Sequence, residues 1–190
     1  MPILASVIGE EFAAILAAAQ DGSEAAFSVL WRDANPALLR YLRVAAPDAA
    51  EDVAAETWVQ VVRGLTGFRG DERAWRSWLF TTTRRRAIDE VRRRSRHPVA
   101  SLAELPGARE PRTQDAAGQA MENLGTAAAI AAISALPPLQ AEVILLRVLA
   151  GLDTEAVARI VGRSPGAVRV AAHRGLRRLA QTMATTGVTL

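Results

Sequence analysis

The sequence predicts an all-α protein of two small helical domains joined by a flexible linker, and three observations support this fold class. Apolar residues recur at helical spacing along most of the 190 residues, and the alternation typical of a β-strand is sustained nowhere. Prolines and glycines separate the periodic stretches, as expected at helix ends. Residues 98–125 are rich in proline, glycine and polar side chains and are too long for a loop inside one compact domain. The expected domains therefore cover residues 1–97 and 126–190.

The first expected domain contains helical stretches separated by polar or proline-containing segments. They cover residues 11–20, 27–31, 38–42, 48 to Gly64 or Gly67, and about 72 to 96. Asn35-Pro36 is expected to separate the second stretch from the third. Asp48 is the expected N-cap of the fourth, with Glu51 three residues later in a box-like arrangement. The last helix is expected to stop before Pro98, because the residue that precedes a proline disfavours the helical conformation.

The second expected domain ends in a helix-turn-helix. Its expected helices are 126–135, 139–149, 155–161 and a last one that begins at Pro165. Asp153 or Thr154 is the expected cap of the third helix, and Gly162 lies in the three-residue turn that follows it. The residues expected to face inward on the last helix are Val168, Ala172, Leu176 and Leu179. In a helix-turn-helix the second helix lies in the DNA major groove, whereas the alternative is a helical hairpin with no such role.

Position along the last helix predicts how each residue would contact DNA. The residues near its start, which would reach base edges, are Gly166, Arg169, Val170 and His173. The residues better placed for phosphates are Arg174, Arg177 and Arg178. A fork from Arg169 to guanine would contribute about 1–3 kcal/mol of discrimination. For His173, the alternative is a partly packed surface position without a DNA contact.

Charge is distributed unevenly along the chain. All 23 basic side chains are arginine, and the formal net charge is only +3. Arginines are concentrated in residues 84–96 and 163–178, whereas residues 48–56 contain four acids and no base. Two basic blocks behind an acidic one indicate polyanion binding at two places, although two solvated helix faces would produce the same pattern.

On the predicted helix 72–96, aromatic residues precede the arginines. Basic grooves with aromatic faces suit unstacked single-stranded bases, and each stacked base contributes about 1–3 kcal/mol. Phe68 and Trp75 are the candidates for exposed stacking, and the alternative places them in the core. The residues of this helix expected to face the core are Trp78, Leu79, Phe80, Ile88 and Val91. Those of the helix that begins at Asp48 are Val53, Trp58, Val61, Val62 and Leu65.

Composition argues against several function classes. The absence of cysteine excludes disulfides, thiolate metal sites and a cysteine nucleophile. The only histidines, His97 and His173, have no arranged carboxylates that would complete a metal site. There is no glycine-rich phosphate loop, so no cofactor, no catalytic residue and no enzyme activity are expected. No apolar run approaches the ~20 residues needed to cross a bilayer, and no signal peptide is evident, so a cytoplasmic protein without membrane insertion is expected.

Several segments, taken in order, resemble bacterial sigma factors of the sigma-70 family. The segments similar to the first conserved sigma domain are 20–27, 38–42, 50–58, 68–70, 78–80 and 86–93. The segments similar to the fourth sigma region are 136–138, 151–153 and the helix-turn-helix as far as Leu176. The extracytoplasmic-function (ECF) type, which keeps only these two domains and a linker, is the most similar group.

This resemblance implies a dissociable subunit of RNA polymerase that selects promoters and helps to open them. Residues 1–97 would form a region 2-like domain and residues 126–190 a region 4-like domain. The implied partners are promoter DNA, the clamp coiled coil of the largest polymerase subunit, the polymerase flap region, and an anti-sigma factor. The implied polymerase-binding residues are Asp48, Glu51, Asp52, Glu56 and Gln60.

The resemblance also assigns DNA contacts to both domains. The residues implied to recognise the −10 element or its single strand are Phe68, Arg69, Asp71, Trp75, Arg76, Arg84, Arg85, Arg86, Asp89, Arg92 and Arg93. Those implied to recognise the −35 element are Arg163, Ser164, Gly166, Arg169, Val170, His173, Arg174, Arg177 and Arg178.

Some residues depart from the family pattern. Ala49 and Ala55 replace polar residues often found in the polymerase-binding segment, and Arg85 replaces the usual asparagine. Val170 replaces a polar base reader and offers only an apolar contact, such as one with a thymine methyl group. The alternative function is a conventional repressor or activator with a helical sensor domain before its helix-turn-helix. That alternative leaves the acidic helix and the aromatic-arginine helix without a role.

Overall fold

The all-α prediction is confirmed by the structure, a computed structural model that describes residues 8–96 and 127–186, with side chains as far as residue 182. In the first half of the molecule, residues 8–96, the elements are η1 (Gly9–Glu11), α1 (Phe12–Gln20), α2 (Glu24–Ala45), η2 (Pro47–Ala49), α3 (Ala50–Leu65) and α4 (Glu72–Arg96). In the second half, residues 127–186, helical residues 127–134 precede α6 (Pro138–Val148), α7 (Thr154–Val161) and α8 (Pro165–Thr186). The expected linker lies outside the described residues.

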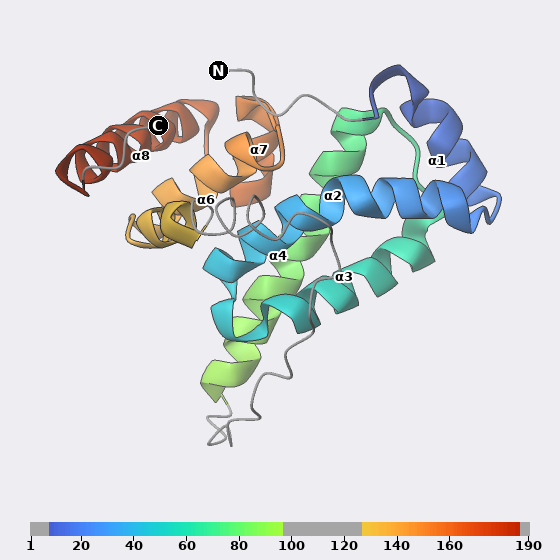
Figure 1. Cartoon of the computed structure of the whole chain (residues 1–190), viewed down its shortest axis with the longest axis horizontal. Helices are drawn as coiled ribbons and strands as arrows, with labels where there is room; N and C mark the ends of the chain where they lie inside the picture. Colours follow the sequence, from blue (N-terminus) through green and yellow to red (C-terminus); the bar gives the residue numbers. More distant parts are fainter. Residues whose placement is uncertain (1–7, 97–126, 187–190) are drawn as a thin grey trace, which may run out of the picture.

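Four helices surround the core of the first half (Figure 1). Helix α2 packs against α1, α3 and α4, and α3 also packs against α4. Ser23 caps α2, since its Oγ accepts a hydrogen bond from Ala26 N. The largest fully buried side chains there are Leu30, Leu38, Tyr41, Leu42, Val53, Val61, Trp75, Leu79 and Phe80.

Two expectations about helix ends in the first half are wrong. Asn35-Pro36 does not interrupt a helix, because α2 continues through Pro36. The buried neighbours Ala37 and Leu38 hold α2 against the core, and this packing outweighs the roughly 3 kcal/mol cost of an interior proline. Asp48 is not a helix cap either: it lies within η2, and neither η2 nor α3 has a side-chain cap.

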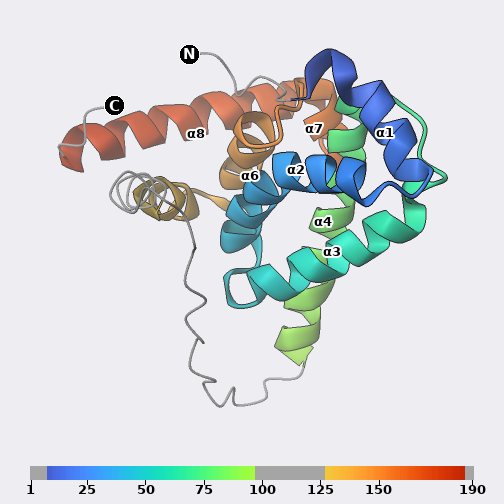
Figure 2. The same cartoon turned by 45° about the vertical axis from the view of Figure 1, so that its right-hand side comes forward.

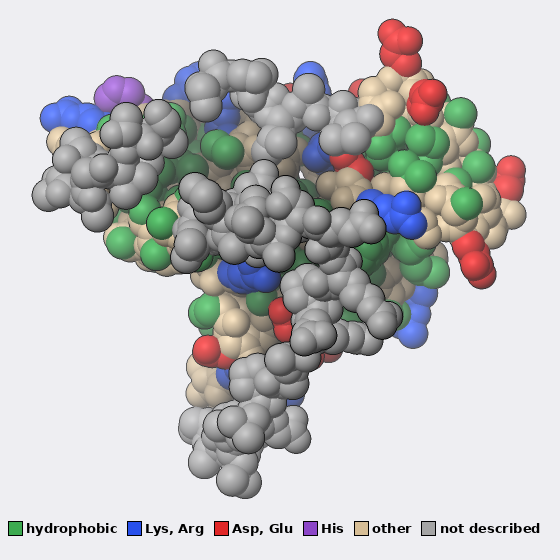
Figure 3. All heavy atoms as spheres, viewed as in Figure 1, with side chains coloured by type: hydrophobic (Ala, Val, Ile, Leu, Met, Phe, Trp, Pro, Cys, Tyr) green, Lys and Arg blue, Asp and Glu red, His purple; other side chains and the backbone are tan. Residues whose placement is uncertain are grey.

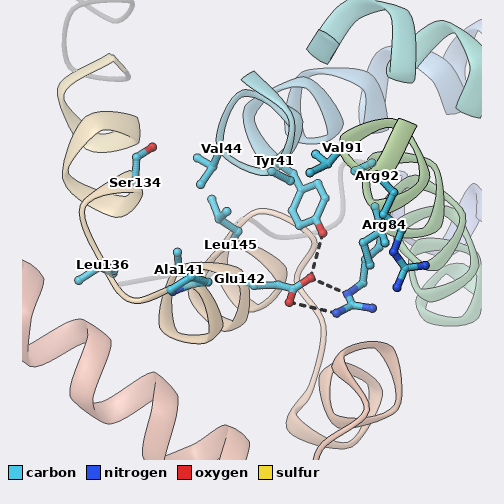
Figure 4. Close-up of a pocket in the computed structure, with 14 residues that line it drawn as sticks. Tyr41, Val44, Arg84, Val91, Arg92, Ser134, Leu136, Ala141, Glu142 and Leu145 are labelled. Atoms are coloured by element: carbon cyan, nitrogen blue, oxygen red, sulfur yellow. Dashed lines mark hydrogen bonds and ion pairs between the residues drawn. The ribbon is translucent and has the colours of Figure 1, made fainter. Parts of the chain in front are cut away.

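Two valines expected in the core are exposed instead. Val62 is 54% exposed on α3, where Val61 and Leu65 are buried. Val91 is 48% exposed near the end of α4. Val91 lines a cavity between α2, α4 and α6 (Figure 4) and does not pack in the core.

The second half has the expected helix-turn-helix. Asp153 caps α7, since its Oδ1 accepts a hydrogen bond from Ala156 N at 2.7 Å. Gly162 ends α7 in the left-handed conformation, with φ of +67°, which glycine adopts without steric cost. Pro165 is the first residue of α8, as predicted. The C-terminal part of α8 extends away from the rest of the molecule (Figures 1 and 2).

The inward stripe of α8 differs from the prediction at one position. Val168 is buried and Leu179 packs against the core as expected, but Leu176 is 54% exposed. Gly175 lies at the interface in its place, because α8 crosses α6 so closely that a Cβ there would lie 2.6 Å from Ile144 Cδ1. The small side chain of Ala171 is buried one turn earlier. Close approach of the two helices thus turns Leu176 outward.

The two halves pack against each other. Most of their buried apolar side chains belong to one cluster that spans both halves, and α2 and α4 contact α6 and α7 respectively. Glu142 of α6 reaches across and accepts hydrogen bonds from Arg84 Nε at 2.6 Å and from the Tyr41 hydroxyl at 3.1 Å (Figure 4). Beside this group lies a cavity of about 470 Å³, lined by α2, α4, α6 and residues 134 and 136. The structure therefore brings α4 and α6, on opposite sides of the predicted linker, into direct contact.

Candidate nucleic-acid interface

The acidic residues of α3 lie on its solvent side. Glu51, Asp52, Glu56 and Gln60 are exposed, and Asp48 is exposed in η2. The exposed apolar residues Val59 and Val62 follow on the next turns of the helix. An acidic surface that continues into apolar residues is suited to a protein partner that carries both positive and apolar groups.

Arg86 of α4 contacts this acidic face. Its Nη1 lies 3.5 Å from Glu56 Oε2, and its Nη2 donates to Gln60 Oε1 at 3.2 Å. The structure thus places Arg86, one of the expected DNA-binding arginines, beside two of the expected polymerase-binding residues.

The α3–α4 loop, residues 66–71, is shaped around the side chain of Phe68. The half-buried ring of Phe68 stacks on Trp78 with centroids 5.2 Å apart and meets Trp75 edge-on at 5.7 Å. Gly70 has a φ of +150°, and a Cβ there would lie 2.7 Å from Ala74 Cβ. The loop therefore requires glycine at this position, and Phe68 is only partly available to a ligand.

Polar groups of the same loop are turned back on its own backbone. Arg69 Nη1 donates to the carbonyl oxygens of Thr66 and Phe68 at 2.8 and 2.7 Å. Asp71 Oδ1 accepts a hydrogen bond from Ala74 N at 2.8 Å, immediately before α4. Arg69 and Asp71, both expected to contact DNA, remain exposed while they make these bonds.

Two residues that were expected to contact DNA instead make contacts inside the first half. Trp75 has no exposed surface and packs against Phe12, Phe68 and Trp78, so the alternative that placed it in the core is correct. Arg76 is only 15% exposed, and its guanidinium binds Asp33 at 2.7 Å and Glu72 at 3.1 Å. Both side chains stabilise the first half and are closed to a nucleic acid in this conformation.

Other arginines of α4 differ in exposure and in whether they have an ion-pair partner. Arg84 is held by Glu142 of the second half, and this hydrogen bond raises its pKa further above the ordinary arginine value. Arg85 and Arg92 are exposed, and within the described part of the chain neither has an ion-pair partner. Arg85 also lines a groove between the start of α4 and α7.

The end of α4 carries a local ion-pair group. Arg93 and Arg94 both bind Glu90, at 2.8 and 2.7 Å, and these hydrogen bonds lower the pKa of Glu90. Asp89 is exposed beside them. The positive charge of this turn is therefore partly neutralised within the helix.

The expected reading surface of α8 is open to solvent. All of the predicted DNA-binding residues of α8 and of the turn before it are exposed: Arg163, Ser164, Gly166, Arg169, Val170, His173, Arg174, Arg177 and Arg178. Figure 3 shows arginine and histidine side chains gathered over α8. Arg169 lies 3.3 Å from Glu155 of α7, and Arg178 donates to Gln140 of α6 at 3.2 Å. These exposed contacts are weak enough to exchange for phosphates or bases.

The described residues contain no cluster of acidic or histidine side chains that would hold a metal ion. Among the same residues, no helix is long and apolar enough to cross a membrane.

From the sequence, no site role was expected for Glu142 or Gln20, and Asp153 was expected only as a helix cap, yet the structure places all three at these sites. Glu142 pairs with Arg84, Asp153 pairs with Arg73 at 3.1 Å, and Gln20 donates to two carbonyl oxygens around the α3–α4 loop. Each partner lies 45 or more residues away in the sequence, so no local pattern identifies these contacts.

Both halves match known protein families. Residues 30–97 match the family described as Sigma-70 region 2, and residues 126–179 match Sigma-70, region 4. ECF RNA polymerase sigma factor ShbA of Streptomyces griseus is 32% identical over 87% of this chain and 92% of its own length. SigD of Mycobacterium tuberculosis is 29% identical over 94% of this chain and 87% of its own length. BldN of Streptomyces coelicolor is 29% identical over 87% of this chain, which spans only 63% of BldN.

Solved structures share the fold. CnrH, solved in complex with the cytosolic domain of CnrY, matches with a TM-score of 0.62 at 21% identity. The match covers 93% of this chain and 99% of the CnrH chain. The sigma factor RpoE of Bartonella quintana, solved in complex with the anti-sigma factor NepR, matches with a TM-score of 0.58 at 22% identity. The match covers 82% of this chain and 94% of the RpoE chain.

Proposed function

This chain belongs to the sigma-70 family and is an ECF-type transcription initiation factor, and we propose which of its surfaces bind polymerase, the −10 element and the −35 element. The observation that carries the proposal is the order of three surfaces along the chain: an exposed acidic face on α3, an aromatic loop with a basic helix, and the open face of α8. A repressor or activator would account for only the last of these.

The α3 face would bind core RNA polymerase. Asp48, Glu51, Asp52, Glu56 and Gln60 would meet positive groups on the clamp coiled coil, and Val59 and Val62 would add apolar contact. Arg86 would orient Glu56 and Gln60 at the edge of this surface. The second half would contact the flap region, and an anti-sigma factor would compete for these surfaces.

The first half would hold one melted strand at the −10 element. An unstacked base would meet the edge of the Phe68–Trp78 stack, and the free arginines Arg85 and Arg92 would attract the backbone phosphates. Since unstacked bases bind this surface better than duplex does, binding shifts the DNA toward the open state. Arg84 would join the strand contacts only after leaving Glu142.

The second half would read the −35 element as duplex. Arg169, near the start of α8, would donate to a guanine, and Arg174, Arg177 and Arg178 would bind phosphates. Val170 would contact a thymine methyl group. Two weak DNA contacts on one polymerase raise each other's effective concentration, so neither half needs to bind DNA tightly alone.

No covalent step is assigned to this chain. Polymerase supplies nucleotide transfer, and the sigma factor acts by binding and positioning, so we propose no enzyme activity and no cofactor. It would act in the cytoplasm, where polymerase and chromosome meet.

Transcription in vitro with core polymerase tests the proposal directly. The wild-type chain should support initiation from promoters selected from its own genome. Glu51→Arg combined with Asp52→Arg should abolish co-purification with polymerase, because both side chains are exposed in the first turn of α3. Glu10→Arg with Glu11→Arg makes the same charge change on η1 and should leave binding intact.

If neither pair alters binding to polymerase, the α3 face is not the polymerase contact. If the wild-type chain supports initiation at none of the promoters, the proposed assignment of all three surfaces is refuted.

A further inference from the structure

Gln20, the last residue of α1, ties α1 to the α3–α4 loop. Its Nε2 donates to Leu65 O at 2.8 Å and to Phe68 O at 2.9 Å, and the contact is partly buried. The partners lie 45 and 48 residues further along the chain. These bonds fasten both ends of the turn that leads from α3 to Phe68.

The chemistry of the partners determines how the amide is oriented. Both acceptors are carbonyl oxygens, which have no hydrogen to donate, so only the NH2 end of Gln20 can face them. That end has two hydrogens, one for each carbonyl. The oxygen of Leu65 belongs to the last residue of α3, where helix carbonyls lack an intrahelical partner.

The bonds from Gln20 act on the residue that supports the stack. Phe68 O accepts hydrogen bonds from Gln20 and from Arg69, while the ring of the same residue stacks on Trp78. Arg69 is exposed, so its guanidinium can leave Phe68 O to bind a DNA phosphate. The amide of Gln20, in contrast, belongs to the last residue of α1 and is held by that helix. Gln20 is therefore the fixed support of the Phe68 backbone.

We infer that Gln20 is a positioning residue for base recognition, which holds the Phe68 backbone so that the α3–α4 loop discriminates among unstacked bases. This inference rests on the proposed function of the loop in binding a melted strand. A recognition surface has to be held within a fraction of an ångström to reject a wrong base, and preformed hydrogen bonds provide that rigidity before DNA arrives. Gln20 itself does not touch the strand.

The test uses holoenzyme reconstituted from core polymerase and the full chain. It is incubated with single-stranded oligonucleotides randomised across the −10 segment, and the bound strands are sequenced. We expect the wild-type chain to prefer one base at the position held by the loop. Gln20→Met keeps the side-chain length but removes both donors, and should lower that preference about tenfold, as expected for the loss of one or two neutral hydrogen bonds.

Leu16→Ala is the matched control. Leu16 is a buried residue of the same helix, so this variant loosens α1 without removing the two hydrogen bonds. It should lower the midpoint of thermal unfolding and leave base preference unchanged. Duplex −35 binding should be unchanged in both variants. Equal loss of base preference in Leu16→Ala and Gln20→Met would mean that general stability matters and would overturn the inference.

Two other results separate this inference from the proposed function. Unchanged preference in folded Gln20→Met would overturn the positioning role alone, whereas a wild-type holoenzyme with no base preference would overturn base capture by the loop as well. Should Gln20→Met not fold, NMR of the wild-type chain decides: the Gln20 side-chain amide protons should exchange slowly with solvent, and rapid exchange would refute the contact.

Discussion

The two halves of the molecule are built from different side chains. All four tryptophans, all four phenylalanines and the single tyrosine lie between Phe12 and Phe80, in the first half. The core of the second half is aliphatic, with valine, leucine, isoleucine and alanine, and α8 approaches α6 across a glycine. The first half therefore has large, rigid rings around a loop, whereas the second half exposes one long helix.

This difference matches two ways of reading DNA. A duplex is read by a helix whose side chains project into a groove, so an exposed α8 on a small core is sufficient. A melted base has no groove to define its position and has to be held against a shaped surface. In the function proposed for the first half, that surface would be formed by Phe68, Trp75 and Trp78, with the Phe68 backbone held by Gln20.

Removing the central ring should break the first half most severely. Trp75→Ala should reduce the free energy of unfolding by about 3–5 kcal/mol, because a fully buried tryptophan leaves a cavity among three other rings. Urea unfolding followed by near-ultraviolet circular dichroism measures this, since the aromatic signal comes only from the first half. The matched variant Trp31→Ala removes a ring that is 41% exposed and should change stability far less. Equal effects would contradict the complete burial of Trp75.

Loss of the ion pair between Arg84 and Glu142, which joins the two halves, should have the next largest effect on stability. Glu142→Gln removes the charge that binds Arg84 and should cost roughly 1.5–3 kcal/mol, toward the lower end because the two side chains are 22% and 26% exposed. Hydrogen exchange of the α4 and α6 backbone amides should accelerate. Glu155→Gln makes the same change at the exposed pair with Arg169 and should alter stability by at most about 1 kcal/mol. A larger loss in Glu155→Gln would show that the halves are not held by Glu142.

Variants of α8 should separate base reading from phosphate binding. Arg169→Ala should relax specificity at one base pair, a loss of about 1–3 kcal/mol of discrimination. Arg177→Ala should weaken all duplexes alike and reduce the slope of log affinity against log salt by about 0.9. Duplex binding by holoenzyme across a salt series measures both. Identical specificity profiles for the two variants would argue against the assigned positions on α8.

The smallest effect is expected at the hydroxyl of Tyr41. Burial, and then the neighbouring Glu142, raise the pKa of Tyr41 above its usual value near 10. A group whose pKa is higher in the folded state adds stability that is complete below its unfolded pKa and is lost as pH rises beyond it. The wild-type chain should therefore lose stability above about pH 10 more steeply than Tyr41→Phe.

At neutral pH, Tyr41→Phe should cost about 0.5–1.5 kcal/mol, the contribution of one hydrogen bond. Because Tyr41 is the only tyrosine, phenolate absorbance during alkaline titration reports this residue alone. Phenolate that appears near pH 10 in the still-folded chain would contradict the burial of Tyr41.

Much of the fold was predictable because its signals are local. The cap at Asp153, the glycine turn at Gly162 and the start of α8 at Pro165 each depend on neighbours within one or two helical turns. The span of α4 was predictable for the same reason. The continuous helix through Pro36 was not, because packing of α2 against the other helices decides it. Spacing alone also could not tell whether Leu176 or Gly175 faces α6.

The candidate site was predictable as a set of surfaces but not residue by residue. Sequence by itself determined most of the helices, the cap at Asp153 and the regions where positive and negative charge collect, since these follow from composition and short-range spacing. Only the tertiary structure decided which side chains stay free: Arg76 and Arg84 are held by carboxylates 43 and 58 residues away, and Trp75 is enclosed by rings from three segments. An ion pair or a buried ring depends on distance in space, and the folded chain alone brings those distant groups together.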